Sequence, residues 1–196
     1  MIAGIAKKIT DNMVANETIL AEDRELYEYG LHQGIIMIIN WLTAAVVGLL
    51  LGMFWQSVML LVFFTPVRIY AGGYHAKTQG ICYVFSTLTQ GVALYLLKCF
   101  PFSLTAGVIV LIISATCLWF LAPVEAENKP LEEGEGKKYK TKAVIHWCVE
   151  VLLWIGLTVF GFCSLADCIL MSSAMVSMLL VLGELSNRRR MRAIKS

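Results

Sequence analysis

The chain has 196 residues, of which 58% are hydrophobic and 15% are charged, and its formal net charge is +2. An ordinary soluble domain is about 25% charged. This composition, with a mean hydropathy of +0.72, therefore argues against a water-soluble globular protein and indicates one lipid-embedded domain, residues 1–196. The small net charge gives no reason to expect nucleic-acid binding.

Residues 1–30 predict an amphipathic helix followed by a polar remainder. Ile2, Ile5, Ile9 and Met13 recur at three- and four-residue steps, and charged residues occupy the other faces. A helix of this kind is suited to lie in the membrane interface. A frayed polar N-terminus would explain the same pattern.

Six apolar runs follow and predict six membrane-spanning helices. The second span is expected to be short, because Pro66 disfavours helix at the residue before it and should end the run near Val67. A tight turn is expected at residues 163–167, before the last span. Spans one and two occupy residues 34–67, with the first at about 34–51; spans three and four occupy 81–121, at about 81–97 and 104–121; spans five and six occupy 143–185.

Polar segments connect the spans at residues 68–80 and 123–142, and a basic tail covers 186–196. With six spans, these segments and both termini lie on one side of the membrane. That side carries fifteen of the sixteen Lys and Arg residues, all but Lys98, so the positive-inside rule makes it cytoplasmic. The sequence therefore predicts an all-α bundle of six transmembrane helices with cytoplasmic N- and C-termini.

The stretch RIYAGGYHAKTQGIC, Arg68 to Cys82, is the candidate reactive segment. A Cys and a His close in sequence are the minimum parts of a thiolate nucleophile and its base. Seven residues of unbroken helix rise about 10.5 Å, so the backbone must fold back before His75 can reach Cys82. Gly72, Gly73 and Gly80 supply such breaks, because glycine adopts positive φ angles without penalty.

Thr78 is a candidate N-cap for the apolar helix that follows this segment. Cys82 would then lie in the first turn of that helix, where free N–H groups and the helix dipole favour a thiolate. On residue types alone there is a second interpretation: a Cys that fills space between apolar residues and a His that is solvated in a loop.

The Arg68–Cys82 stretch resembles the signature of the accessory gene regulator B (AgrB) family, multi-pass bacterial membrane cysteine endopeptidases that mature a peptide pheromone. A second stretch, APVEAENKPL from Ala122 to Leu131, is similar to that family's loop after its fourth span. The resemblance implies that His75 and Cys82 are the catalytic pair, and that Arg68 and Gly73 matter for activity.

The resemblance also implies the reaction and its setting. An AgrD-like propeptide would be cleaved through a Cys82 thioester, and the peptide's own Cys or Ser would then close a thiolactone or lactone ring. The site would lie at the cytoplasmic face of the bacterial cell membrane, and the family suggests a homodimer. Nothing in the sequence indicates a metal or another cofactor, since its cysteines form neither a CxxC pair nor a zinc-spaced set.

Supporting roles are open at several positions. Arg68 fits either a grip on a propeptide carboxylate or an interaction with lipid phosphate, and Gly72 and Gly73 fit either close substrate approach or a turn. Glu150 is costly inside the fifth span; it could support the site or pair with His146 one turn away.

Two other classes of protein compete with the peptidase interpretation. A small multi-pass transporter or exporter would also contain broken helices and buried polar groups; Asn40, Gln56 and Gln90 are expected to form bonds between helices. A metal or thiol-redox membrane protein would use His75, Cys82, His146 and Cys148.

Overall fold

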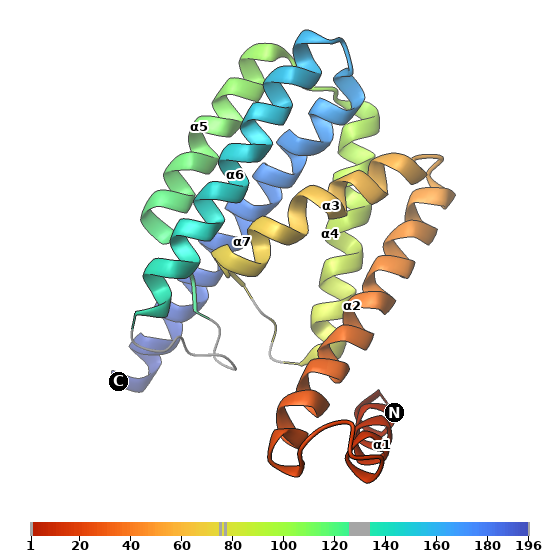
Figure 1. Ribbon diagram of the computed structural model, residues 1–196. Coiled ribbons are helices and arrows are strands. Elements are labelled where there is room, and N and C mark those ends of the chain that lie inside the picture. The colour runs from red at the N-terminus through yellow and green to blue at the C-terminus, as the bar shows by residue number, and fades with distance from the viewer. Residues whose placement is uncertain (1, 75, 77, 126–133, 196) are drawn as a thin grey trace. The chain divides into compact units, whose positions relative to one another are not determined.

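The computed structural model describes residues 2–74, 76, 78–125 and 134–195. The chain divides into two compact units, residues 1–44 and 45–196, and α2 runs from the first into the second. The helices, drawn in Figure 1, are α1 (Ile2–Ala15), the short 3-10 helix η1 (Ala21–Asp23), α2 (Arg24–Leu50), α3 (Phe54–Ala71), α4 (Gln79–Cys99), α5 (Leu104–Leu121), α6 (Glu135–Val159) and α7 (Cys163–Lys195).

An ion pair ties α1 to the start of α2 within the first unit. Arg24 donates from Nε and Nη2 to Asp11 Oδ1 at 2.9 and 2.7 Å, and its Nη2 lies 3.3 Å from Glu28. The Arg24–Glu28 pair, one turn apart, favours helix, which helps explain why α2 begins ten residues before the predicted span. The predicted N-terminal helix is present as α1; its place in the membrane interface stays a prediction.

Six helices in the described residues are long and apolar enough to cross a membrane. This confirms the predicted class, an all-α protein with six transmembrane helices. The fourth span has the predicted bounds in α5, and α4 extends the third predicted span by two residues at each end.

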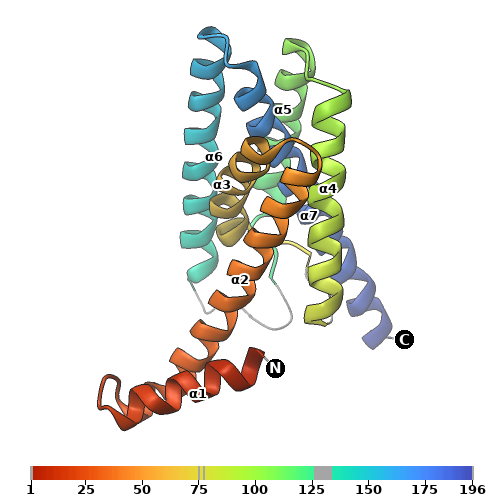
Figure 2. The ribbon, with the colours of Figure 1, turned by 90° about the vertical axis from the view of Figure 1, so that its right-hand side faces the viewer.

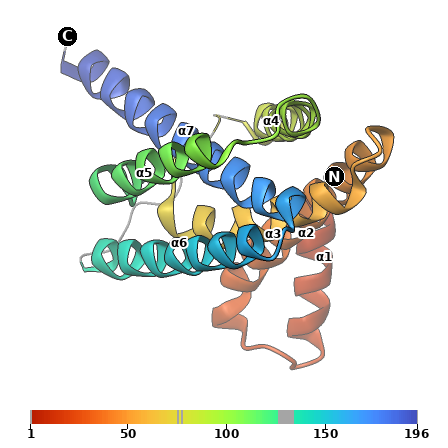
Figure 3. The same ribbon diagram turned by 90° about the horizontal axis from the view of Figure 1, so that it is seen from above.

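The last helix, α7, forms the centre of the second unit. In its most apolar stretch 67% of the residues are buried, against 22% or less in each of the other five spans. Figure 3 shows α7 running obliquely between α5 and α6, and Figure 2 shows α3 lying between α6 and α4. Buried α7 residues such as Ile169, Val176 and Leu180 pack in the clusters that join these helices.

The prediction that Pro66 ends the second span is wrong. Helix α3 continues through Pro66 to Ala71, which makes it 18 residues long, about 27 Å at 1.5 Å per residue. A proline removes one backbone donor, but Val67 and Ala71 beyond it are fully buried against α5 and α7. Their packing extends the helix, so Arg68 lies on its last turn rather than in a loop.

Helices α6 and α7 are also longer than predicted. Helix α6 begins at Glu135, inside the predicted polar connection, where a run of good helix formers precedes the apolar residues. The turn before α7 lies at residues 160–162 and not at 163–167, because Gly161 takes a φ of 80°. The predicted basic tail continues α7 as helix to Lys195, with Arg188 paired to Glu184 at 2.7 Å.

The second unit has two distinct ends (Figure 1). At the turn end, Lys98 donates to the carbonyl of Leu51, and Gln56 donates to Ser164 at 3.2 Å, which is a predicted bond between helices. Deeper in the bundle, Gln90 donates to Ser57 Oγ of α3 at 3.2 Å, as predicted. The bond of Asn40 differs from the prediction: its Nδ2 donates to the Ile36 carbonyl within α2 at 3.0 Å, because a short polar side chain can reach the carbonyl four residues earlier in its own helix. The loop end carries residues 72–74, residues 122–125 and the last turns of α7, and the candidate reactive segment lies there.

Candidate active site

The candidate site begins where α3 ends. Arg68, on the last turn of α3, donates from Nη2 to the carbonyl oxygen of Tyr74 at 2.8 Å. The guanidinium therefore binds the backbone of the segment six residues further on. Neither of the two roles expected for Arg68 included this bond within the protein.

Beyond α3 the backbone pairs with the segment that follows α5. Gly73 N–H donates to the carbonyl of Val124 at 3.2 Å, and Val124 N–H donates to the carbonyl of Ala71 at 2.9 Å. Gly72 and Gly73 take φ angles of 70° and 125°, which residues other than glycine rarely adopt. The two stretches singled out in the sequence, separated by about fifty residues, thus lie side by side.

The space at Gly72 allows no side chain. A Cβ added there would lie 2.1 Å from the carbonyl oxygen of Val124. Gly72 is therefore required for the close approach of two backbone segments within the chain, which explains its place in the motif without a contact to substrate.

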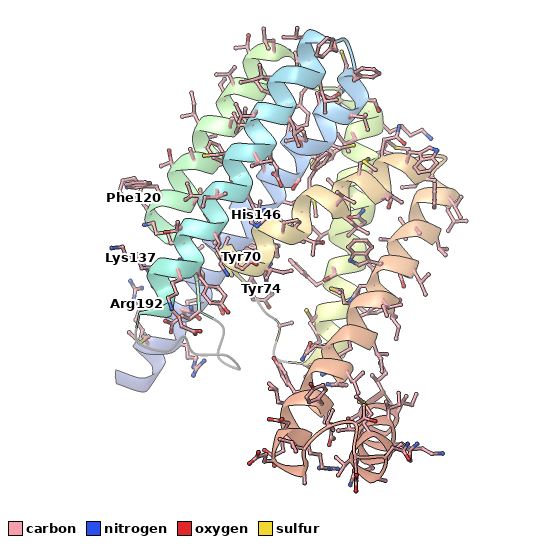
Figure 4. All side chains as sticks on the ribbon, viewed as in Figure 1. Tyr70, Tyr74, Phe120, Lys137, His146 and Arg192 are labelled. Atoms are coloured by element: carbon pink, nitrogen blue, oxygen red, sulfur yellow. The ribbon has the colours of Figure 1, made fainter. Side chains whose placement is uncertain are left out.

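Tyr74 is held on three sides. Its N–H donates to the carbonyl of Leu179 on α7 at 2.8 Å, its carbonyl accepts from Arg68, and its ring meets Phe85 of α4 edge to face at 5.5 Å between centroids. Figure 4 shows Tyr74 just beyond the end of α3. This residue connects α3, α4 and α7 at the loop end.

Helix α4 then begins with the predicted cap. Gly80, expected to break the chain, is instead the second residue of this helix. Thr78 Oγ1 accepts from Ile81 N–H at 3.3 Å, and Cys82 N–H donates to the Thr78 carbonyl at 3.0 Å. The half-buried thiol of Cys82 is thereby carried by the first turn of α4, as the sequence predicted.

The fold links Arg68 to the helix that carries Cys82. Arg68 binds the Tyr74 carbonyl, and the Tyr74 ring packs on Phe85, three residues beyond Cys82 on α4. His75 lies outside the described residues, so its pairing with Cys82 stays a prediction.

Glu150 lies inside the bundle on α6. It is 4% exposed, and its Oε2 has no hydrogen-bond partner in the part of the chain that the structure describes. The expected pair with His146 is not seen there: the His146 ring stacks on Tyr70 of α3 at 5.3 Å and 7°, and Figure 4 shows the two rings together. Lys142 Nζ lies 5.1 Å from the centroid of the same Tyr70 ring.

Three residues of the site were not found from the sequence. Val124 and Leu179 contribute through backbone carbonyls, for which a sequence carries no residue-type signal. Gly183 meets the reactive segment closely; the available signal was an isolated glycine inside an apolar helical run, which often marks a close backbone approach. In the described ranges, His, Cys, Asp and Glu side chains form no group of three or more suited to a metal ion.

The six apolar helices and the site at their loop end define a multi-pass membrane protein. The chain belongs to the accessory gene regulator B family, whose model matches residues 6–181. Two similar proteins come from Clostridium perfringens, and their names describe them as AgrB-like. They are 22% identical (strain SM101) and 23% identical (strain 13) over 164 residues, which cover 78% of this chain and 77% of each relative. No solved structure gives a significant match.

Proposed function

We propose that this protein is a membrane cysteine endopeptidase that cleaves an AgrD-like propeptide and closes the product into a ring. The observation that supports the proposal is a chain of contacts at the loop end of the bundle: Arg68 binds the Tyr74 carbonyl, and the Tyr74 ring packs on Phe85 of α4, the helix whose first turn carries Cys82. Membership in the AgrB family supports the same activity.

In the first step Cys82 acts as the nucleophile. His75 takes the thiol proton, the sulfur attacks the scissile carbonyl carbon, and a C–S bond forms as the peptide C–N bond breaks. His75 then returns the proton to the departing amine. Negative charge develops on the carbonyl oxygen during this step, and the Arg68 guanidinium is suited to stabilise it.

The second step uses the thioester left on Cys82. A thioester remains activated, so a second nucleophile can take the acyl group. When the substrate's own Cys or Ser attacks, the C–S bond to Cys82 breaks, a thiolactone or lactone closes, and the Cys82 thiol is restored. Ring closure rests on the family resemblance.

The loop end would face the cytoplasm of a bacterial cell. All basic residues but Lys98 belong to that side, in agreement with the positive-inside rule, and a reducing cytosol would keep Cys82 as a thiol. The propeptide and the lipid bilayer are then the partners. A homodimer is part of the same proposal and is tested by the mass of the detergent-solubilised protein.

Co-expression with a propeptide tests the proposal. Cys82→Ala and His75→Ala are expected to abolish cleavage while the protein reaches the membrane at wild-type level, and mass spectrometry of the products measures this. Cys99→Ala is the matched control, because Cys99 is exposed at the other end of the same helix. A Cys82→Ala protein that still cleaves would falsify the proposal.

A small-molecule or peptide exporter is the second candidate. The buried carboxyl of Glu150 favours it, since ionisable groups inside membrane helices often mark transport pathways. An exporter would lose solute release in Glu150→Gln and keep it in Cys82→Ala, which is the opposite of the outcome expected for the peptidase.

A further inference from the structure

The reactive segment rests directly on the backbone of α7. A Cβ placed on Gly183 would lie 2.6 Å from the backbone nitrogen of Tyr74 and 2.7 Å from the carbonyl carbon of Gly73. Figure 1 shows the end of α3 beside α7. The two nearest atoms belong to the main chain, and Val124 Cγ1 follows at 2.9 Å, so no rotation of a side chain can relieve the two closest contacts.

The loop side of this contact also leaves no space for a side chain. A Cβ on Gly73 would lie 2.9 Å from the carbonyl oxygen of Leu179, the atom that accepts the Tyr74 N–H. Leu179 and Gly183 are four residues apart and therefore share a face of α7. Two glycines on facing segments thus let a loop and a helix touch through backbone alone.

We propose that Gly183 is a positioning residue for the reaction at Cys82, an inference that rests on the proposed function. Gly183 and the Leu179 carbonyl together form a contact surface on α7, called the seat below, that fixes the position of Tyr74. Tyr74 in turn accepts the Arg68 hydrogen bond and packs its ring on Phe85, three residues beyond Cys82. Displacement of Tyr74 therefore moves the Arg68 and Cys82 groups that the proposed reaction needs in register.

The size of the displacement follows from the distances. Ordinary contact for a Cβ begins at 3.4 Å, so the Tyr74 nitrogen must move by about 0.8 Å if residue 183 is alanine. The Tyr74–Leu179 hydrogen bond cannot absorb such a movement without stretching. A misplacement of about 1 Å can lower an enzymatic rate roughly 100-fold even when the altered residue does not touch the substrate.

Gly183→Ala separates positioning from helix stability. Alanine is a better helix former than glycine, so the substitution favours α7 itself while it displaces the loop. Gly156→Ala on α6 is the matched control, because a Cβ there meets nothing within 4 Å. It brings the same gain in helix propensity and no displacement.

Two measurements on the full-length protein in membranes test the proposal. In Gly183→Ala we expect propeptide cleavage to fall about 100-fold, with little change in the propeptide concentration for half-maximal rate. We also expect faster amide hydrogen exchange at residues 72–74. Gly156→Ala should match wild type in both. If Gly183→Ala fails to reach the membrane, Gly73→Ala closes the same gap from the loop side and should give the same two results.

The outcomes are distinguishable from those of the proposed function. If amide hydrogen exchange at residues 72–74 is as slow in Gly183→Ala as in wild type, with or without loss of cleavage, Gly183 does not hold the loop in place. Faster exchange with wild-type cleavage overturns the positioning role. If Cys82→Ala still cleaves, the peptidase proposal fails, and the exchange measurement decides independently whether Gly183 seats the loop.

Discussion

At the scale of single residues, Arg68 contributes to the site through a bond to the backbone of the reactive segment. Its guanidinium donates to the Tyr74 carbonyl at 2.8 Å, and the Tyr74 ring packs on Phe85 of α4. One planar group thus joins the end of α3 to the backbone of the reactive segment. A lysine ammonium carries the same charge but lacks the fixed fork of donors that can serve two directions.

Arg68→Lys is accordingly expected to lower propeptide cleavage by about tenfold to 100-fold, since the loss of a charge-assisted hydrogen bond costs roughly 1.5–3 kcal/mol. The protein should reach the membrane at its normal level. Cleavage rates in membranes measure the effect, and Arg189→Lys, on the exposed end of α7, serves as the control. An Arg68→Lys protein with full activity would show that charge alone is sufficient.

Local sequence signals predicted part of this site well. The Thr78 cap and the position of Cys82 follow from residues within a few places of each other. The Leu179 carbonyl and Gly183 could not be predicted in the same way, because they meet Tyr74 from more than a hundred positions away. Such a contact depends on how α7 crosses the bundle, which no local pattern records.

At the scale of helices, the start of α4 decides how the thiol is presented. Thr78 Oγ1 satisfies the Ile81 N–H, and the next backbone bond, from Cys82 to the Thr78 carbonyl, closes the first turn. Loss of an N-cap typically costs about 1 kcal/mol. The cost would fall on the turn that carries Cys82.

Thr78→Ala should therefore fray the first turn of α4 and reduce cleavage, whereas Thr78→Ser should retain both the cap and the activity. Amide hydrogen exchange at residues 81–83 reports fraying separately from turnover. Equal exchange in the alanine and serine variants would mean that the cap is not what holds this turn.

Helix ends were predicted less well than helix existence. The composition of each apolar run was sufficient to predict the six spans. Pro66 was misread as an end because the burial of Val67 and Ala71, which carries α3 onward, depends on α5 and α7. Likewise, α6 and α7 extend through charged residues that a hydropathy pattern assigns to water.

At the scale of the whole molecule, the two ends of the second unit differ in charge. Helix α4 connects them: Cys82 lies in its first turn and Cys99 is its last residue. If the loop end is cytoplasmic, as the distribution of Lys and Arg predicts, the two thiols face opposite sides of the membrane.

A thiol reagent that cannot cross membranes tests this orientation with native residues. Added to intact cells, it is expected to modify Cys99, which is exposed, and to leave Cys82 unmodified; in opened cells it should reach both. Mass spectrometry of the labelled peptides identifies the sites. Modification of Cys82 in intact cells would invert the proposed topology.

The central place of α7 has a consequence for how the molecule is made. This helix of 33 residues leaves the ribosome after the other five spans, and its synthesis takes about 2–7 s at 5–20 residues per second. Until then the amide of Tyr74 has no Leu179 carbonyl to bind, and helices α3 to α6 lack their common neighbour. Under the proposed function, Cys82 of a nascent chain is therefore inactive. It becomes active only late in translation, when α7 packs against the helices made before it.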